Sequence, residues 1–168
     1  MILSQLERCK KITLQQACCV LETAPYPEQL SRMLSAPAPS SSMELFEARQ
    51  SAGILGLIHM EPDFRRAQIV VEPFVPAETG NLRASIYWLL YYAFHVKKLH
   101  KLYAITPEEN DPVHEFWQSF GFVWEARLRD FFPTGRGWGN GLACSMLRHE
   151  FESQFGHIRS MNELRLGS

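Results

Sequence analysis

Two residues near the ends of predicted strands have side chains that can accept a proton from a substrate. Glu72 closes the strand-like stretch at residues 67–72, and His59 lies near the end of the stretch before it. A carboxylate or an imidazole acts as a general base when the proton of a substrate lies within hydrogen-bonding reach. An exposed strand-end carboxylate and a surface or packed histidine are the alternative interpretations of these two residues.

Three strands are needed to position these two side chains. Residues 43–49, 54–60 and 67–72 have strand-like composition, and turn-forming residues separate them at 50–53 and around Pro62. The pattern therefore predicts an antiparallel meander. Upstream, Thr13 is a candidate helix cap, Pro27 can begin a second short helix, and residues 36–42 are rich in proline and serine and predict a loop.

The second half of the chain predicts helices alternating with strands. Residues 81–96 are apolar on most sides, which indicates a helix that is buried over most of its surface. Residues 101–106 predict a short strand. Asp111 as N-cap, Pro112 in the first turn and Gly121 as the terminator define the next helix. Strands at residues 122–132 and 142–147 follow, joined by a glycine-rich turn at 135–141, and the tail after Phe151 has weak helical character.

Length and composition predict one globular domain over residues 1–168. Within it we expect a helical segment and loop at residues 1–42, a core at 43–151 and a tail at 152–168. The first residues carry several charges and no long apolar stretch, which argues against a signal peptide. The longest apolar stretch is too short to span a membrane. We therefore expect a soluble, cytoplasmic protein that does not bind membranes.

Charge and cysteine content argue against two other classes of partner. The formal net charge is −1, and the lysines and arginines are scattered, so no basic face for a nucleic acid is evident. The four cysteines lack a metal-binding spacing, and the neighbours Cys18 and Cys19 cannot easily form an unstrained disulfide. Reduced, packed thiols are the expectation, with no metal site.

Residues 110–122, with the sequence Asn-Asp-Pro-Val-His-Glu-Phe-Trp-Gln-Ser-Phe-Gly-Phe, resemble the GNAT superfamily of N-acyltransferases. That family's segment begins with asparagine, continues as an amphipathic helix and ends in Gly-Phe. The element order and the segments at 125–129 and 147–151 match too, and are most similar to the branch of ribosomal-protein N-terminal acetyltransferases. The resemblance covers roughly residues 43–151. It implies an α+β fold: a mostly antiparallel, twisted sheet with splayed fourth and fifth strands and flanking helices.

The resemblance also implies acetyl-CoA, or another acyl-CoA, as co-substrate. In this family an Arg/Gln-x-x-Gly-x-Gly/Ala loop opens the long helix and holds the pyrophosphate, because backbone N–H groups and the helix dipole attract an anion. In the aligned stretch at 79–84, Thr79 replaces the basic or amide residue, Leu82 replaces the central glycine, and Arg83 supplies a positive charge. The implied cofactor contacts in this stretch are Thr79, Gly80, Asn81, Leu82, Arg83 and Ala84.

Further roles follow from the same resemblance. Pro73 removes a donor from the strand ladder and is tolerated where the two strands part to admit the pantetheine arm. Phe74 and Val75 would then offer backbone groups to that arm. Asn110 would contact the cofactor, with a helix-entry residue as the alternative. Trp117 stands where many relatives carry a tyrosine that protonates the leaving thiolate, and because an indole is not a usable acid we also expect it to pack in the core.

The implied activity is N-acyl transfer to a primary amine by direct attack within a ternary complex. Glu72 is the first candidate base, His59 the second, and Trp117 would lie at the departing thiolate. Two alternatives stay open: a GNAT-fold module that has lost catalysis and binds or scaffolds a partner, and an acyltransferase that takes its acyl group from a carrier protein. The acceptor is either a small molecule or a protein N-terminus, and a homodimer is one option for the assembly.

Overall fold

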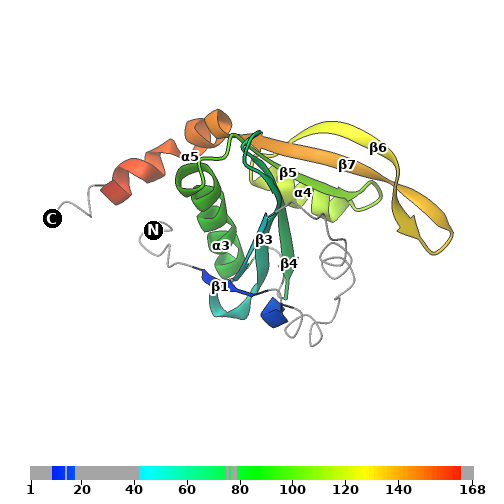
Figure 1. Ribbon diagram of the computed structural model, residues 1–168, viewed down its shortest axis with the longest axis horizontal. Coiled ribbons are helices and arrows are strands. Elements are labelled where there is room, and N and C mark those ends of the chain that lie inside the picture. The colour runs from blue at the N-terminus through cyan, green and yellow to red at the C-terminus, as the bar shows by residue number, and fades with distance from the viewer. Residues whose placement is uncertain (1–8, 14, 18–41, 75, 77–78, 164–168) are drawn as a thin grey trace. The chain divides into compact units, whose positions relative to one another are not determined.

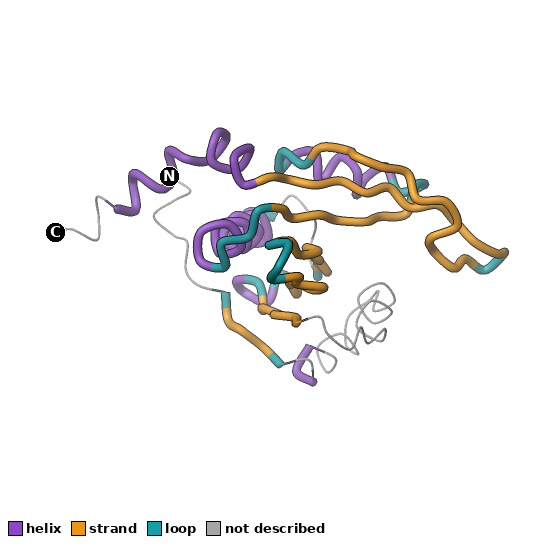
Figure 2. The backbone as a smooth tube through the Cα atoms, turned by 45° about the horizontal axis from the view of Figure 1, so that its top comes forward, coloured by secondary structure: helices purple, strands orange, loops and turns teal. Residues whose placement is uncertain are grey.

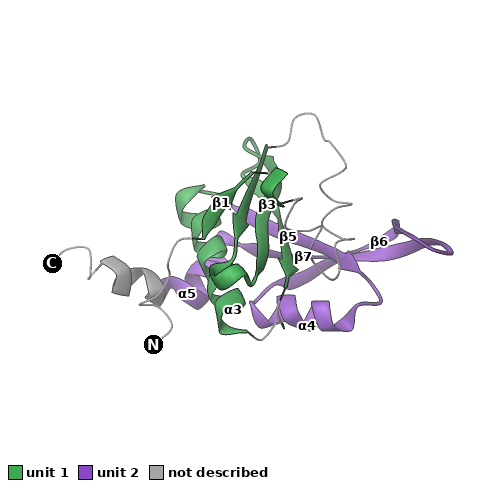
Figure 3. Ribbon diagram, turned by 90° about the horizontal axis from the view of Figure 1, so that it is seen from below, with its two compact units in different colours: residues 1–99 green, residues 100–168 purple. Residues whose placement is uncertain are grey.

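The structure is a computed structural model, shown in Figures 1 and 2, that describes residues 9–13, 15–17, 42–74, 76 and 79–163, with side chains as far as residue 156. It consists of two compact units, residues 1–99 and 100–168, shown in two colours in Figure 3. A single domain would include both units, and the expected splay would lie between β4 (Arg66–Pro73) of the first unit and β5 (Lys101–Pro107) of the second. Both expectations stay predictions.

The sheet of the first unit is an antiparallel meander. β2 pairs with β3 and β3 with β4, as the sequence predicts, and a short strand, β1, joins β2 at the edge. The strands are β1 (Lys10–Ile12), β2 (Ser42–Glu47), β3 (Gly53–Glu61) and β4 (Arg66–Pro73). β1 was not predicted, because three residues that include two lysines carry no recognisable strand pattern.

Each face of this sheet buries apolar side chains. Because side chains alternate along a strand, Leu45, Ile54 and Val70 share one face, where they cluster with Ile12 and Ala17. Ala17 follows Thr13, whose hydroxyl accepts a hydrogen bond from the Gln16 N–H at 3.2 Å, so the predicted cap is confirmed. The rest of that helix and the predicted helix after Pro27 lie outside the described residues.

The long helix α3 (Gly80–Tyr91) covers the opposite face and ends in a π-helical turn, Tyr92–Val96. The Phe46 ring on β2 lies 5.0 Å from the Trp88 ring and 5.3 Å from the Tyr92 ring, measured between centroids. Leu82, Ile86, Leu89, Leu90, Ala93 and Phe94 are fully buried. The predicted helix with most of its surface buried is therefore confirmed.

The described residues of the second unit, 100–163, form three strands and two helices. β7 lies between β5 and β6 and is antiparallel to both. The helix α4 lies alongside these strands in Figure 1. The elements are β5 (Lys101–Pro107), α4 (Asp111–Ser119), β6 (Val123–Thr134), β7 (Gly137–Leu147) and α5 (Arg148–Glu163). Both units thus combine antiparallel strands with flanking helices, and the predicted α+β class is confirmed.

Two predicted boundaries in this unit were wrong. The glycine-rich stretch at 135–141 is mostly strand, and β6 and β7 pair as far as Thr134 and Gly137. At Gly141 a Cβ would approach the Ile105 side chain to 3.2 Å, so this glycine permits close packing of β7 against β5. The N-cap of α4 is Asn110, one residue before the predicted Asp111. Across the described residues, no helix combines the length and apolarity needed to cross a membrane.

Candidate functional site

Among the described residues of the first unit, Glu72 carries a carboxyl group whose pKa is strongly raised. It lies on β4 opposite Ile54, on the face that carries the apolar cluster. Burial raises the pKa of the Glu72 carboxyl from its ordinary value of 4.5 to about 7. A carboxyl group with a pKa near neutrality is suited to general base catalysis, because it is basic enough to take a proton and largely ionised slightly above pH 7.

The end of β4 is held closely against the start of β3. Gly53 pairs with Pro73, and a Cβ on Gly53 would lie 2.4 Å from the Glu72 carbonyl oxygen. The Phe74 N–H donates a hydrogen bond to the Ala52 carbonyl at 2.9 Å. Of the backbone groups expected to meet the pantetheine arm, the Phe74 N–H is therefore already used within the first unit. Val75 lies outside the described residues.

His59 does not lie beside Glu72. It follows Ile54, the partner of Glu72, by five residues along β3. At about 3.3 Å per residue, that separates the two positions by roughly 16 Å along the strand. His59 has a φ of 49° and lies within an irregularity in the pairing of β3 with β4. The two candidate bases therefore belong to different ends of the hairpin, and only Glu72 combines burial with proximity to the start of α3 in sequence.

The start of α3 presents backbone donors without a side-chain cap. Thr79 is the N-cap and makes no side-chain capping hydrogen bond, and the first bond of the helical ladder runs from the Arg83 N–H to the Thr79 carbonyl at 3.1 Å. The N–H groups of the first turn have no acceptor within the helix. A Cβ on Gly80 would meet no atom of the described residues within 4 Å, so none of these residues covers this position. Such a terminus favours an anion.

The side chains of Leu82 and Asn81 both have partners within the first unit. The Leu82 side chain is fully buried in the core of the first unit, so only its N–H can take part in the predicted cofactor contact. The Asn81 side-chain amide donates a hydrogen bond to the Gln50 Oε1 at 2.5 Å. Arg83 and Ala84 are half-buried in the same helix. The predicted contacts in this stretch therefore reduce to backbone donors and the charge of Arg83.

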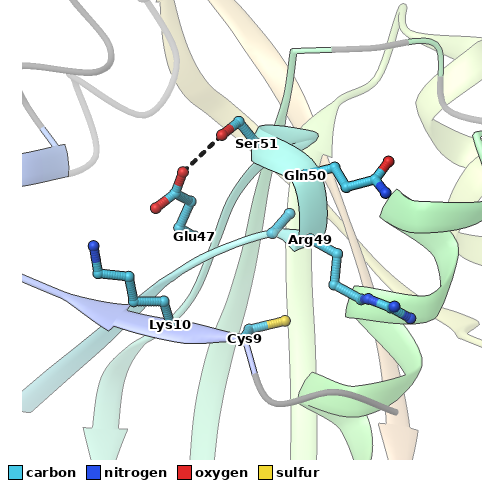
Figure 4. Close-up of a pocket in the computed structure, with 7 residues that line it drawn as sticks. Cys9, Lys10, Glu47, Arg49, Gln50 and Ser51 are labelled. Carbon is cyan, nitrogen blue, oxygen red and sulfur yellow. Dashed lines mark hydrogen bonds between the residues drawn. The ribbon is translucent and has the colours of Figure 1, made fainter. Parts of the chain in front are cut away.

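The turn between β2 and β3 anchors the first turn of α3, which the sequence did not indicate. The Arg49 N–H donates to the Ser85 hydroxyl at 3.0 Å, and that hydroxyl donates to the Asn81 carbonyl at 2.7 Å. Gln50 and Ser51 have positive φ angles near 50°. Beside this turn is a pocket of about 300 Å³ (Figure 4). The residues that line it are Cys9, Lys10, Glu47, Ala48, Arg49, Gln50 and Ser51.

Two predicted site residues lie on α4 in the second unit. Asn110 is the N-cap, but its side chain makes no capping hydrogen bond, whereas its carbonyl accepts hydrogen bonds from the N–H groups of Val113 and His114. Its side-chain amide is therefore not needed by the helix. Trp117 is 4% exposed, and its ring centroid lies 4.9 Å from that of Phe122. The expected packing role of Trp117 is confirmed, and its role at a thiolate stays a prediction.

Both units together contain the elements that define the GNAT acetyltransferase fold. The spermidine/spermine N-acetyltransferase SpeG from Vibrio cholerae superposes with a TM-score of 0.67 at 18% sequence identity, over 92% of this chain and 99% of that chain. A second solved structure, described as a putative acetyltransferase, gives a TM-score of 0.69 at 18% identity over 90% of each chain. These likenesses establish the fold.

Sequence comparison also finds a relative that is named as an acetyltransferase. The spermidine N(1)-acetyltransferase of Escherichia coli K12 is 29% identical over 105 residues, which is 61% of this chain and 55% of that protein. This chain therefore spans about half the length of the curated relatives it matches. No protein family model matches the sequence. The predicted similarity to the ribosomal-protein branch stays a prediction.

Proposed function

We propose that this chain is an acyl-CoA-dependent N-acyltransferase that transfers an acetyl group to a primary amine by direct attack within a ternary complex. One observation carries the proposal most: β4 ends in a carboxyl group whose pKa is about 7, and eight residues later α3 opens with uncapped backbone donors. A general base and an anion site are two of the elements that acyl transfer from CoA uses. The acetyltransferase relatives support the same class of reaction.

In the proposed mechanism the diphosphate of acetyl-CoA binds at the start of α3, where Gly80 leaves the backbone accessible. The side-chain amide of Asn110 is a further donor and acceptor for the cofactor. Glu72 takes a proton from the ammonium form of the acceptor, and the neutral nitrogen attacks the thioester carbonyl. The tetrahedral intermediate then collapses: the C–S bond breaks, the sulfur keeps the bonding electron pair, and the second proton that the nitrogen must lose passes through solvent to the departing thiolate. Charge stabilisation at the oxyanion and at the sulfur lowers the barrier.

We propose a polyamine of the spermidine class as the acceptor. The curated relatives are named for spermidine, and the solved SpeG structure is named for spermidine and spermine. Glu72 supports this choice, because a carboxylate attracts an ammonium group before it accepts a proton from it. A protein N-terminus is the competing acceptor, and a peptide with a free α-amino group serves to test it.

The test is release of the CoA thiol from acetyl-CoA in the presence of spermidine, a monoamine or an N-terminal peptide, with the acetylated product identified by mass spectrometry. We expect turnover with spermidine. Gly80→Glu should abolish turnover through charge repulsion, while Gly80→Gln, of the same size without charge, should retain more of it, since a Cβ at this position meets nothing. Cofactor binding without thiol release from any amine would favour the binding-module alternative, and release only from an acyl-carrier protein would favour the carrier-protein donor.

A further inference from the structure

The His114 imidazole joins the start of α4 to the strand before it. Its Nε2 lies 3.0 Å from the carbonyl oxygen of Pro107, the last residue of β5. A carbonyl oxygen can only accept a hydrogen bond, so the Nε2 atom carries the proton and donates it. This hydrogen bond therefore ties the first turn of α4 to the end of β5, within the second unit.

Two further contacts keep the His114 ring in one orientation. The Trp124 ring on β6 packs against it, with 4.8 Å between the centroids and 72° between the ring planes. On α4 itself, the His114 Nδ1 lies 3.7 Å from the Asp111 Oδ1, and the two groups form an ion pair when the imidazole is protonated. The His114 side chain is only 12% exposed. A ring held in this way directs its Nε2–H at the Pro107 carbonyl persistently.

The Pro107 carbonyl is also the anchor of the turn that leads into α4. The Asn110 N–H donates a hydrogen bond to the same oxygen at 3.2 Å, which closes a tight turn over residues 107–110. The Asn110 carbonyl accepts hydrogen bonds from the N–H groups of Val113 and His114, at 3.1 Å and 3.2 Å. His114 thus contacts both ends of this turn, through its ring at Pro107 and through its backbone at Asn110.

The backbone of Asn110 is held by this turn, whereas its side-chain amide is not used by the helix. Asn110 has a φ of −108° and a ψ of 71°, between the extended and helical regions, and its side chain makes no capping hydrogen bond. The residue is half-buried, with part of its surface accessible. Because the side chain leaves from the Cα atom, the turn decides where the amide lies. A binding group needs supporting residues that hold it within about 0.5 Å of the productive position.

We propose that His114 is a positioning residue for the cofactor: its imidazole fixes the turn before α4 and thereby holds the Asn110 side-chain amide in place to bind acyl-CoA. This inference rests on the proposed acyltransferase function, in which Asn110 contacts the cofactor. His114 acts through Asn110 on the affinity for acyl-CoA. The binding of the amine and the chemical step do not depend on it.

Two substitutions separate the hydrogen bond of His114 from its packing. His114→Phe keeps a ring against Trp124 and removes the donor, whereas His114→Gln removes the ring and keeps an N–H group that can donate to the Pro107 carbonyl. In His114→Phe the Pro107 carbonyl still accepts from the Asn110 N–H, so no buried carbonyl is left without a partner. We therefore expect both variants to fold.

The test measures the Kd of acetyl-CoA by calorimetry, together with kcat and the KM of the amine. His114→Phe should weaken acetyl-CoA binding about three- to tenfold and leave kcat and the amine KM within about twofold of wild type. His114→Gln should bind acetyl-CoA within about twofold of wild type, because it restores the donor. In the Asn110→Ala background, His114→Phe should have no further effect, because the group that it positions is gone. His149→Phe, at an exposed histidine on α5, is the matched control and should change none of these values.

The outcomes separate the proposed function from the role of His114. A wild type that neither binds acetyl-CoA nor releases thiol with any amine refutes the function itself. A wild type that binds, with an unchanged Kd in His114→Phe, overturns the role of His114 and leaves the function intact. An equal loss of affinity from His114→Phe with and without Asn110 shows that the two residues act independently, and it also overturns the inference.

A measurement on the wild type decides the question if a His114 variant does not fold. Nuclear magnetic resonance of the imidazole nitrogens at pH 9 should show the proton on Nε2 of His114, and addition of CoA at neutral pH should shift the side-chain amide signal of Asn110. A proton on Nδ1 instead, or an Asn110 amide signal that saturating CoA leaves unchanged, overturns the inference.

Discussion

Replacing Glu72 by glutamine should stabilise the protein at alkaline pH while it removes activity. Burial raises the pKa of the folded-state carboxyl from 4.5 to about 7. The folded protein therefore holds this proton over a pH range in which the unfolded chain has released it. The sign follows directly: wild-type stability decreases as the pH rises from about 4.5 to about 7, because the buried carboxylate must then carry its charge. Glutamine is neutral throughout and avoids that cost.

The magnitude comes from the size of the pKa change. A pKa change of one corresponds to about 1.4 kcal/mol, so the full change corresponds to at most about 3 kcal/mol at pH 8. The Glu72 side chain is only partly buried, and solvent screening reduces this to about 1–2 kcal/mol. For a chain of this size each kcal/mol shifts the unfolding midpoint by about 2–4 °C, so we expect a rise of about 2–8 °C at pH 8. At pH 4 the variant and wild type should unfold within about 1 °C of each other.

The assay is thermal unfolding of wild type and Glu72→Gln from pH 4 to pH 9, combined with steady-state acetyl transfer. The kcat/KM of the wild type should rise through an apparent pKa near 7 as Glu72 loses its proton. The variant should lose that limb of the profile and be about 10²- to 10⁴-fold slower. Glu115→Gln, at an exposed carboxylate on α4, is the matched control and should change neither property. A variant that is no more stable than wild type at pH 8, or that keeps its activity, would refute the reasoning.

Four further substitutions have expected outcomes. Gly53→Ala should lower the free energy of unfolding, measured in urea, by about 1–3 kcal/mol, because its Cβ would lie 2.4 Å from the Glu72 carbonyl oxygen. Gly80→Ala should be near neutral, so equal stability of the two variants would contradict the geometry. Asn110→Ala should raise the KM of acetyl-CoA about tenfold. It should lower the free energy of unfolding by less than the roughly 1 kcal/mol that an ordinary N-cap contributes, because the Asn110 side chain makes no capping hydrogen bond. A large loss of stability in unfolding followed by circular dichroism would count against this. Trp117→Ala should cost about 3–5 kcal/mol in the same urea measurement, and a stable variant would show that the indole is not a core residue.

Elements with strong local signals could be predicted from the sequence. The helix over residues 111–119 combines an N-terminal proline, apolar spacing and a glycine stop, and it forms with its N-cap one residue earlier than expected. The meander and the buried long helix also follow from local patterns of apolar residues. Glu72 could be found as a candidate base from its place at a strand end, but its raised pKa depends on burial, which only the folded chain determines.

Features that depend on contacts between distant residues were missed. The strand Lys10–Ile12 exists because Ser42–Glu47 offers it an edge, and the sequence of three residues cannot reveal that. Leu82 stands in place of the central glycine of the cofactor loop, and only the folded helix shows that its side chain lies in the core.

Calorimetric titration with acetyl-CoA tests the central claim most directly, because cofactor binding precedes every other step. We expect the wild type to bind acetyl-CoA with a Kd between about 1 μM and 1 mM, the range of typical enzyme KM values. Gly80→Gln should bind more weakly, and Gly80→Glu should not bind, while both keep the unfolding profile of the wild type, since position 80 is open. No heat of binding for the wild type at high micromolar acetyl-CoA, or equal binding by Gly80→Glu, would contradict the account.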